Sequence, residues 1–267
     1  MKRCECMRLV LLGLLVSSVS GCGELPIRDP RVRIVAFGDS ATTGQDAPAY
    51  PALMEELLGL SSGLVVNEGE SGETAAESVD RLASLVASGI YPNAEIWIHW
   101  HGGNDLQLFI SETDPFLTTS PSDGAFDFSA ELSMTLDDII DSIRQAVQTV
   151  REAGIDVVLV TYYPVRDGTG FCPAIPIPII LPSQVAVANE YLDLLNARLR
   201  AFADEASLLL VDVSTLGAQL QADVGNYADC NHLSPAGNAQ VASLVGAMLE
   251  SAFPERLALF RQAEEGD

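Results

Sequence analysis

The serine at position 40 stands where a nucleophile could act. It ends the stretch GDS at 38–40, directly after the apolar run IVAF at 34–37. Such a run predicts a buried strand, and Gly38 allows a sharp turn at the strand's carboxyl end. Taken alone, the stretch favours Ser40 or Thr42 as a helix N-cap. The nucleophile hypothesis therefore requires a base, a carboxylate and oxyanion donors elsewhere in the chain.

Three other segments contain such groups. Asp229 and His232 lie three residues apart in DCNHLSPAG, so the carboxylate can hold the imidazole Nδ1–H while Nε2 faces a serine. In HGGNDL, two glycines let the chain aim Asn104 at the same cleft, and in NEGESGET, Gly72 can bring a bare backbone N–H close to a ligand. Each segment alone is typical of a turn or a helix cap. The prediction therefore depends on the ordered set.

The segments must be positioned by strands and helices, which the apolar runs predict. Strands are expected at 32–37, 64–67, 95–100, 156–161 and 207–211, and the clearest helices at 50–58, 74–88, 130–153, 184–206 and 235–251. This alternation predicts an α/β fold whose parallel sheet is covered on both faces, with the site at the carboxyl ends of the strands. Two long connections, 106–129 and 164–183, are typical of walls or lids.

Together, the four segments resemble the four sequence blocks of the SGNH (GDSL-type) hydrolase family. The resemblance spans residues 34–237 and departs from the family at Ala41, where leucine is frequent. It implies a three-layer α/β/α sandwich similar to flavodoxin, with a five-stranded parallel sheet, and ester hydrolysis without a metal or organic cofactor. No Gly-x-Ser-x-Gly motif surrounds Ser40, which argues against the nucleophile elbow of α/β-hydrolases.

The resemblance also assigns roles to residues. Ser40, Asp229 and His232 are implied as the catalytic triad, and the Ser40 N–H, the Gly72 N–H and the Asn104 side chain as the oxyanion hole. We therefore expect a serine esterase for carboxylic esters, with short to medium acyl chains. The alternatives are a carbohydrate O-acetyl esterase, a phospholipid-active acylhydrolase or, in a different class, a binding lipoprotein without turnover.

Two further histidines, His99 and His101, lie in or beside a strand whose alternate residues are large and apolar. We interpret them as packing or cleft-lining groups and not as zinc ligands, because no third ligand stands at a suitable spacing.

The first 22 residues are typical of an export signal, with a basic start and an apolar run from Leu9 to Val16. The stretch VSGC at 19–22 resembles a bacterial lipobox, which implies cleavage before Cys22 and lipidation of that cysteine. We accordingly expect a signal at 1–22, a tether at 23–30, the hydrolase domain at 31–252 and a tail at 253–267. The expected location is a membrane, reached by export and held by the lipid.

The charge of the exported chain limits its partners. Cleavage removes three basic residues and one acidic residue, so the formal net charge moves from -23 to -25, and no lysine remains. Nucleic acid and anionic lipid would be repelled by such a surface.

Two cysteines, Cys172 and Cys230, remain besides Cys22, and export favours a disulfide between them. Such a bridge would hold the start of PAIPIPIILP, at 173–182, near the proposed catalytic loop. We predict that this segment forms an apolar wall of the acyl pocket; the alternative is that its isoleucines fill the core or touch the membrane. The side chains expected in the wall are Ile177, Ile179 and Ile180.

Overall fold

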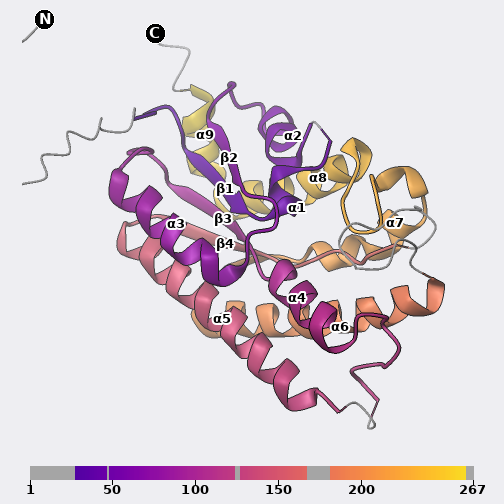
Figure 1. The fold of residues 1–267 in the computed structure, drawn as a ribbon. Helices are drawn as coiled ribbons and strands as arrows, with labels where there is room; N and C mark the ends of the chain where they lie inside the picture. The colour runs from indigo at the N-terminus through magenta and orange to yellow at the C-terminus, as the bar shows by residue number, and fades with distance from the viewer. Residues whose placement is uncertain (1–27, 47, 124–126, 167–180, 263–267) are drawn as a thin grey trace, which may run out of the picture.

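The computed structural model describes residues 28–46, 48–123, 127–166 and 181–262. At its centre lies a five-stranded parallel sheet in the order β2-β1-β3-β4-β5 (Figure 1). The strands are β1 (Ile34–Gly38), β2 (Val65–Gly69), β3 (Ile96–Trp100), β4 (Asp156–Val160) and β5 (Leu209–Val211). The predicted five-stranded parallel sheet is thus confirmed, with strand ends that differ by a few residues from the expected ones.

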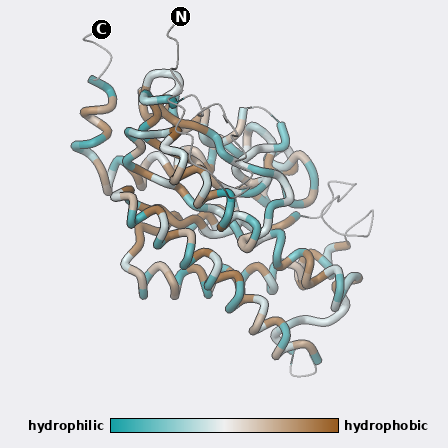
Figure 2. The backbone as a smooth tube through the Cα atoms, turned by 60° about the vertical axis from the view of Figure 1, so that its left-hand side comes forward, coloured by the Kyte–Doolittle hydropathy of each residue, from teal (hydrophilic) through white to brown (hydrophobic). Residues whose placement is uncertain are grey.

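Helices cover both faces of the sheet, which completes the three predicted layers (Figure 1). On one side, α2 (Tyr50–Leu57) packs against α8 (Pro235–Ala252). On the other side, α5 (Ser129–Glu152) packs against both α3 (Ala75–Ser88) and α6 (Pro182–Ala206). Figure 2 shows hydrophilic and hydrophobic stretches alternating along the helices, as expected when one face of each helix packs on the sheet.

The central strands are apolar because both of their faces are buried. Every residue of β1 and β3 is buried, whereas β2 at the sheet edge is only partly so. Successive side chains of β3 point to opposite faces. Trp100 therefore contacts Tyr50 of α2, while Trp97 packs with the Phe37 ring.

Among the longer helices of the described residues, two were not predicted. The first is α4 (Gly103–Thr113), which occupies the start of the connection 106–129. The second is α9 (Pro254–Gln262), which lies in the segment we expected to be a tail from residue 253 onward. Its Leu257 and Phe260 are buried, and Arg261 Nε donates to the Leu58 carbonyl at 2.7 Å. Its apolar signal was weak because so few of its side chains reach the core.

Shorter elements complete the chain and lie near the sheet's carboxyl edge. They are α1 (Ser40–Thr43), α7 (Gly217–Gln221) and the 3-10 turns η1 (Val213–Leu216) and η2 (Val224–Asn226). Within the described ranges, we find no helix that combines the length and the hydropathy needed to cross a membrane.

Candidate active site

Ser40 lies at the carboxyl end of β1, as the first residue of α1. The helix cap is Asp39, whose Oδ1 accepts the Ala41 N–H at 2.9 Å. The alternative that Ser40 or Thr42 caps the helix is therefore wrong, and the Ser40 hydroxyl is left for another partner. The turn is tight enough to require glycine at position 38, because a Cβ there would lie 2.1 Å from Thr42 Oγ1.

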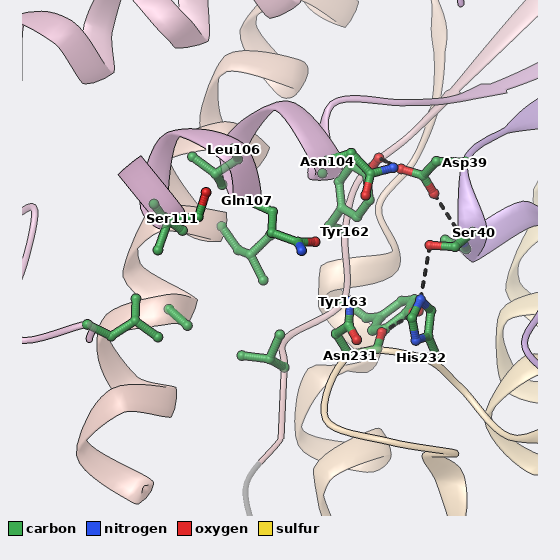
Figure 3. A pocket seen from close by; sticks show the side chains of 17 residues that line it. Asp39, Ser40, Asn104, Leu106, Gln107, Ser111, Tyr162, Tyr163, Asn231 and His232 are labelled. Atoms are coloured by element: carbon green, nitrogen blue, oxygen red, sulfur yellow. Dashed lines mark hydrogen bonds between the residues drawn. The ribbon is translucent and has the colours of Figure 1, made fainter. Parts of the chain in front are cut away.

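The partner of Ser40 is His232. Its Nε2 lies 3.1 Å from Ser40 Oγ (Figure 3). Its Nδ1 lies 2.7 Å from Asp229 Oδ2. The other carboxylate oxygen, Asp229 Oδ1, accepts the backbone N–H groups of Asn231 at 2.9 Å and His232 at 2.8 Å. Burial alone would raise the pKa of Asp229, but these hydrogen bonds from the ring and the backbone lower it. The carboxylate is therefore held ionised and in one orientation.

The loop that carries Asp229 and His232 is bonded to the segment after β4 and is closed by a hydrogen bond of its own. The Tyr163 hydroxyl donates to the Asn231 carbonyl at 2.9 Å, and the Ala228 N–H donates to the His232 carbonyl at 2.8 Å. Cys230, between the two site residues, is fully buried and disulfide-bonded. Cys172 lies outside the described residues, so its pairing with Cys230 stays a prediction.

Two N–H donors, one from Ser40 and one from Asn104, lie at the same pocket. In the described part of the chain, the Ser40 N–H donates to no protein acceptor, as expected at the first turn of a helix. Asn104, in the first turn of α4, uses one Nδ2–H to bond the Glu73 carbonyl at 2.8 Å and lines the same pocket as Ser40. Its second Nδ2–H is left for a ligand.

Gly72 is placed less directly. It is exposed, and its φ of +87° is a left-handed conformation that explains why glycine stands there. Gly72 does not line the pocket around Ser40, but the carbonyl of its neighbour Glu73 accepts the Asn104 amide. The loop that carries Gly72 is thus fastened to the segment that carries Asn104.

A buried, hydrogen-bonded pair that we did not predict lies next to Ser40. The Tyr162 hydroxyl donates to Asp39 Oδ2 at 2.6 Å, and both residues are buried. Burial raises the pKa of Asp39 and raises that of Tyr162 well above its usual value, so the phenol stays a donor. A signal for this pair existed, because Tyr162 follows the fourth predicted strand at its carboxyl end.

A pocket of about 90 Å³ opens beside Ser40 and His232 (Figure 3). Its apolar walls come from α4 and α6, mainly through Leu106, Ile110, Ala188 and Leu192. The side chain of Gln107, one turn after Asn104, points into the same space (Figure 3). The predicted wall residues Ile177, Ile179 and Ile180 lie outside the described residues, as does Cys22. The connection 106–129, which we predicted to be a wall or lid, supplies the α4 part of these walls, but its helix was not predicted.

His99 and His101 are packing residues and line no part of this pocket. Both are buried in an aromatic layer with Phe37, at ring centroid distances of 5.7 and 5.0 Å. Burial lowers the pKa of His99 far below its usual value, so its ring is neutral. Across the described residues, no three His, Cys, Asp or Glu side chains are grouped in a way that could hold a metal ion.

The geometry defines what this site can do chemically. A hydroxyl faces an imidazole whose other nitrogen is held by a carboxylate, and the Asn104 amide lines the same pocket as the hydroxyl. Such an arrangement can remove the proton of the hydroxyl and stabilise negative charge on a substrate oxygen beside it.

The chain is similar to known proteins in sequence profile and in fold. The sequence profile of the GDSL-like lipase/acylhydrolase family matches residues 36–240. No curated protein matches the chain as a relative in sequence. Solved structures match it at low identity, and this likeness shows the fold alone.

Three of these structures illustrate the fold. An aryl esterase from M. smegmatis is 17% identical with a TM-score of 0.57, and the match covers 82% of this chain and 99% of that one. A carbohydrate acetylesterase from Sinorhizobium meliloti is 16% identical with a TM-score of 0.56, covering 83% and 100%. A member of the lipolytic protein G-D-S-L family from Veillonella parvula is 14% identical with a TM-score of 0.56, covering 84% and 99%.

Proposed function

Because the chain belongs to the GDSL-like lipase/acylhydrolase family, we propose that it is a serine esterase that hydrolyses carboxylic esters through Ser40, His232 and Asp229. One observation carries the proposal. A continuous hydrogen-bond chain runs from Ser40 Oγ through the imidazole to the Asp229 carboxylate, with spacings of 3.1 and 2.7 Å. Ser40 and His232 both line the apolar pocket.

The first chemical step is acylation of the serine. Ser40 Oγ attacks the ester carbonyl carbon as its proton moves to His232 Nε2. Asp229 keeps the second ring proton on Nδ1, so Nε2 is the nitrogen that accepts. His232 then gives its proton to the leaving alcohol, and the acyl-serine ester remains.

Negative charge collects on the carbonyl oxygen during this attack. We assign the Ser40 N–H, the Asn104 Nδ2–H and the Gly72 N–H to that oxygen. Fixed donors at such a position stabilise the transition state, and removing one typically lowers turnover about 100- to 1,000-fold. Water, activated by His232, then attacks the acyl group and releases the acid.

The apolar pocket supports esters with short to medium acyl chains. Leu106, Ile110 and Leu192 would contact the chain, and each buried methylene adds up to about 0.8 kcal/mol. The pocket also contains Gln107 and Asn231, which could bind polar groups. A carbohydrate O-acetyl esterase or a phospholipid-active acylhydrolase therefore stays as an alternative within the same chemistry.

The test compares two serine variants that line the same pocket. In Ser40→Ala, labelling by a fluorophosphonate and hydrolysis of p-nitrophenyl esters should both disappear. Ser111→Ala is the matched control, because the Ser111 hydroxyl lines the pocket but donates to the Leu108 carbonyl at 2.8 Å. It should keep labelling and turnover within about twofold of the unaltered protein.

The outcomes separate enzyme from binding protein. Labelling that survives Ser40→Ala would mean that the nucleophile lies elsewhere. A folded, unaltered protein that neither labels nor turns over any ester from acetate to long acyl chains would favour the non-catalytic binding lipoprotein.

We also propose that the protein is exported and anchored to a membrane by lipid on Cys22. The support is the sequence alone, because residues 1–27 lie outside the described part of the chain. Incorporation of a labelled fatty acid in the producing bacterium should be lost in Cys22→Ala. Incorporation that persists in that variant would contradict the lipid site.

A further inference from the structure

A buried ionic cluster lies behind the proposed oxyanion site and has no role in the mechanism above. Glu73, which is only 7% exposed, accepts on its carboxylate from Arg81 Nε at 2.6 Å and Nη2 at 2.5 Å. Its Oε2 also lies 2.8 Å from His101 Nε2. Arg81 itself stacks over the Phe37 ring at 4.0 Å and donates to the Glu68 carbonyl at 3.1 Å. Glu73 is therefore held rigidly on two sides.

The backbone of the same residue holds Asn104. The Glu73 carbonyl accepts Asn104 Nδ2 at 2.8 Å. A second hydrogen bond joins the same two segments, since the Ala75 N–H donates to Asp105 Oδ2 at 2.8 Å. The loop after β2 is thus bonded to three residues after β3, through side chains of His101, Asn104 and Asp105.

The direction of the free Asn104 N–H depends on this carbonyl. The terminal torsion of an asparagine side chain is broad, so rotamer preference alone does not fix the plane of the amide. A hydrogen bond from one Nδ2–H to a fixed acceptor does fix it, and the second Nδ2–H then points in one direction. Misplacing a catalytic group by about 1 Å can cost on the order of 100-fold in rate.

We infer that Glu73 is a positioning residue, which orients the Asn104 amide for the oxyanion by holding its own carbonyl in place through Arg81 and His101. This inference rests on the proposed esterase function. Glu73 does not touch the substrate in this scheme. It acts on turnover only through Asn104.

The first experiment compares two glutamates that contact the same arginine. Glu70 lies 3.3 Å from Arg81 Nε but its side chain is 63% exposed, and it bonds neither His101 nor Asn104. Glu73→Ala should lower kcat on the order of 100-fold, with KM changed less than about threefold. Glu70→Ala should leave both constants within about twofold, because exposed ion pairs contribute little.

A double-mutant cycle separates positioning from a general loss of structure. If Glu73 acts through Asn104, adding Glu73→Ala to Asn104→Ala should lower kcat by less than about 10-fold further. Effects that multiply in full would overturn the inference. So would a kcat of Glu73→Ala close to that of the unaltered protein.

A conservative variant covers the case in which Glu73→Ala fails to fold. Glu73→Gln keeps the side-chain shape and one acceptor for Arg81. Its kcat should be about 10-fold higher than that of Glu73→Ala. If Glu73→Ala is unfolded, the comparison is with the unaltered protein, and the kcat of Glu73→Gln should be about 10-fold lower. No loss in a folded Glu73→Gln, when Glu73→Ala cannot be measured, would count against the inference. Fluorophosphonate labelling of the unaltered protein and of Ser40→Ala in the same series tests the esterase function separately. If the unaltered protein labels normally and the kcat of the Glu73 variant is unchanged, only the positioning role is refuted.

Discussion

Replacing Asp229 with asparagine tests the proposed triad through a single atom. The substitution keeps the side-chain shape, but one carboxylate oxygen stays an oxygen and the other becomes an NH₂ group. Asp229 Oδ1 accepts two backbone N–H groups, at 2.9 and 2.8 Å. An amide nitrogen at that position would face two donors and lose both hydrogen bonds, at about 1 kcal/mol each or more. The asparagine carbonyl will therefore take the Oδ1 position.

This orientation forces the wrong tautomer on the histidine. The asparagine Nδ2–H₂ then faces His232 Nδ1, in place of the Oδ2 that lies 2.7 Å away. Two donors cannot face each other, so Nδ1 becomes the acceptor and the proton of the neutral ring moves to Nε2. Nε2 would then point a hydrogen at Ser40 Oγ and could not accept its proton.

The expected loss is about 10,000-fold in kcat, the size seen when a triad carboxylate becomes an amide. This factor corresponds to about 5.5 kcal/mol of transition-state stabilisation. KM should change little, because Asp229 does not line the pocket. The thermal midpoint should also change little, because the backbone hydrogen bonds of the loop are kept.

The assay is steady-state hydrolysis of p-nitrophenyl butyrate, beside a matched control. Asp223 supplies one, since its Oδ1 accepts the Gly225 N–H at 2.8 Å in the same part of the chain but no histidine contacts it. Asp223→Asn should retain kcat within about twofold. An Asp229→Asn protein that keeps more than one-tenth of the activity would refute the assignment of Asp229 to the histidine.

Three further predictions follow from the same geometry. Asn104→Ala should lower kcat about 100- to 1,000-fold with little change in KM. Gln107→Ala, one turn further along the same pocket, should leave kcat unchanged. If Asn104→Ala changes mainly KM, Asn104 is assigned to substrate binding. Leu192→Ala should lengthen the pocket and shift kcat/KM from butyrate towards octanoate esters by severalfold, and an unchanged ratio would place the acyl chain elsewhere. For Asp212, burial would raise the pKa, but hydrogen bonds from Arg200, Ser214 and Thr161 lower it from 3.8 to about 2. The ionised Asp212 therefore contributes about 2 kcal/mol to folding stability above pH 4, and this contribution is lost as the pH falls towards 2. Asp212→Asn should lower the free energy of unfolding at pH 7 and lower it less at pH 3, as measured by urea unfolding. A substitution that lowers it equally at pH 7 and pH 3 would contradict this.

Much of the fold could be predicted because parallel strands leave a simple signal. Strands such as β1 and β3 are buried on both faces, so they stand out as continuous apolar runs. The weaker elements could not be predicted in this way. Helix α9 buries only Leu257 and Phe260, and α4 lies inside a connection that also forms part of the pocket wall.

The site divides along a similar line. Ser40, Asn104 and the Asp229–His232 pair could be named from sequence, because the carboxyl ends of parallel strands meet at one edge of a sheet. Tyr162 carried a readable signal that we did not use, and the connection 106–129 was predicted to be a wall or lid without its helix. The bond between Glu73 and His101 carried none, since nothing local relates two residues separated by a helix and a strand.

The sequence by itself determined which chemical groups lie at the carboxyl ends of the strands. Residue types are read directly, and strand ends follow from short-range patterns of apolar residues. Only the tertiary structure decided which of those groups are engaged elsewhere and which are left for a substrate. Ser40 Oγ meets His232 Nε2, Asp39 Oδ2 accepts from the Tyr162 hydroxyl, and one Nδ2–H of Asn104 is used by the Glu73 carbonyl. The physical reason is that a hydrogen bond depends on distance and direction between groups far apart in the chain, and these exist only once the layers have packed.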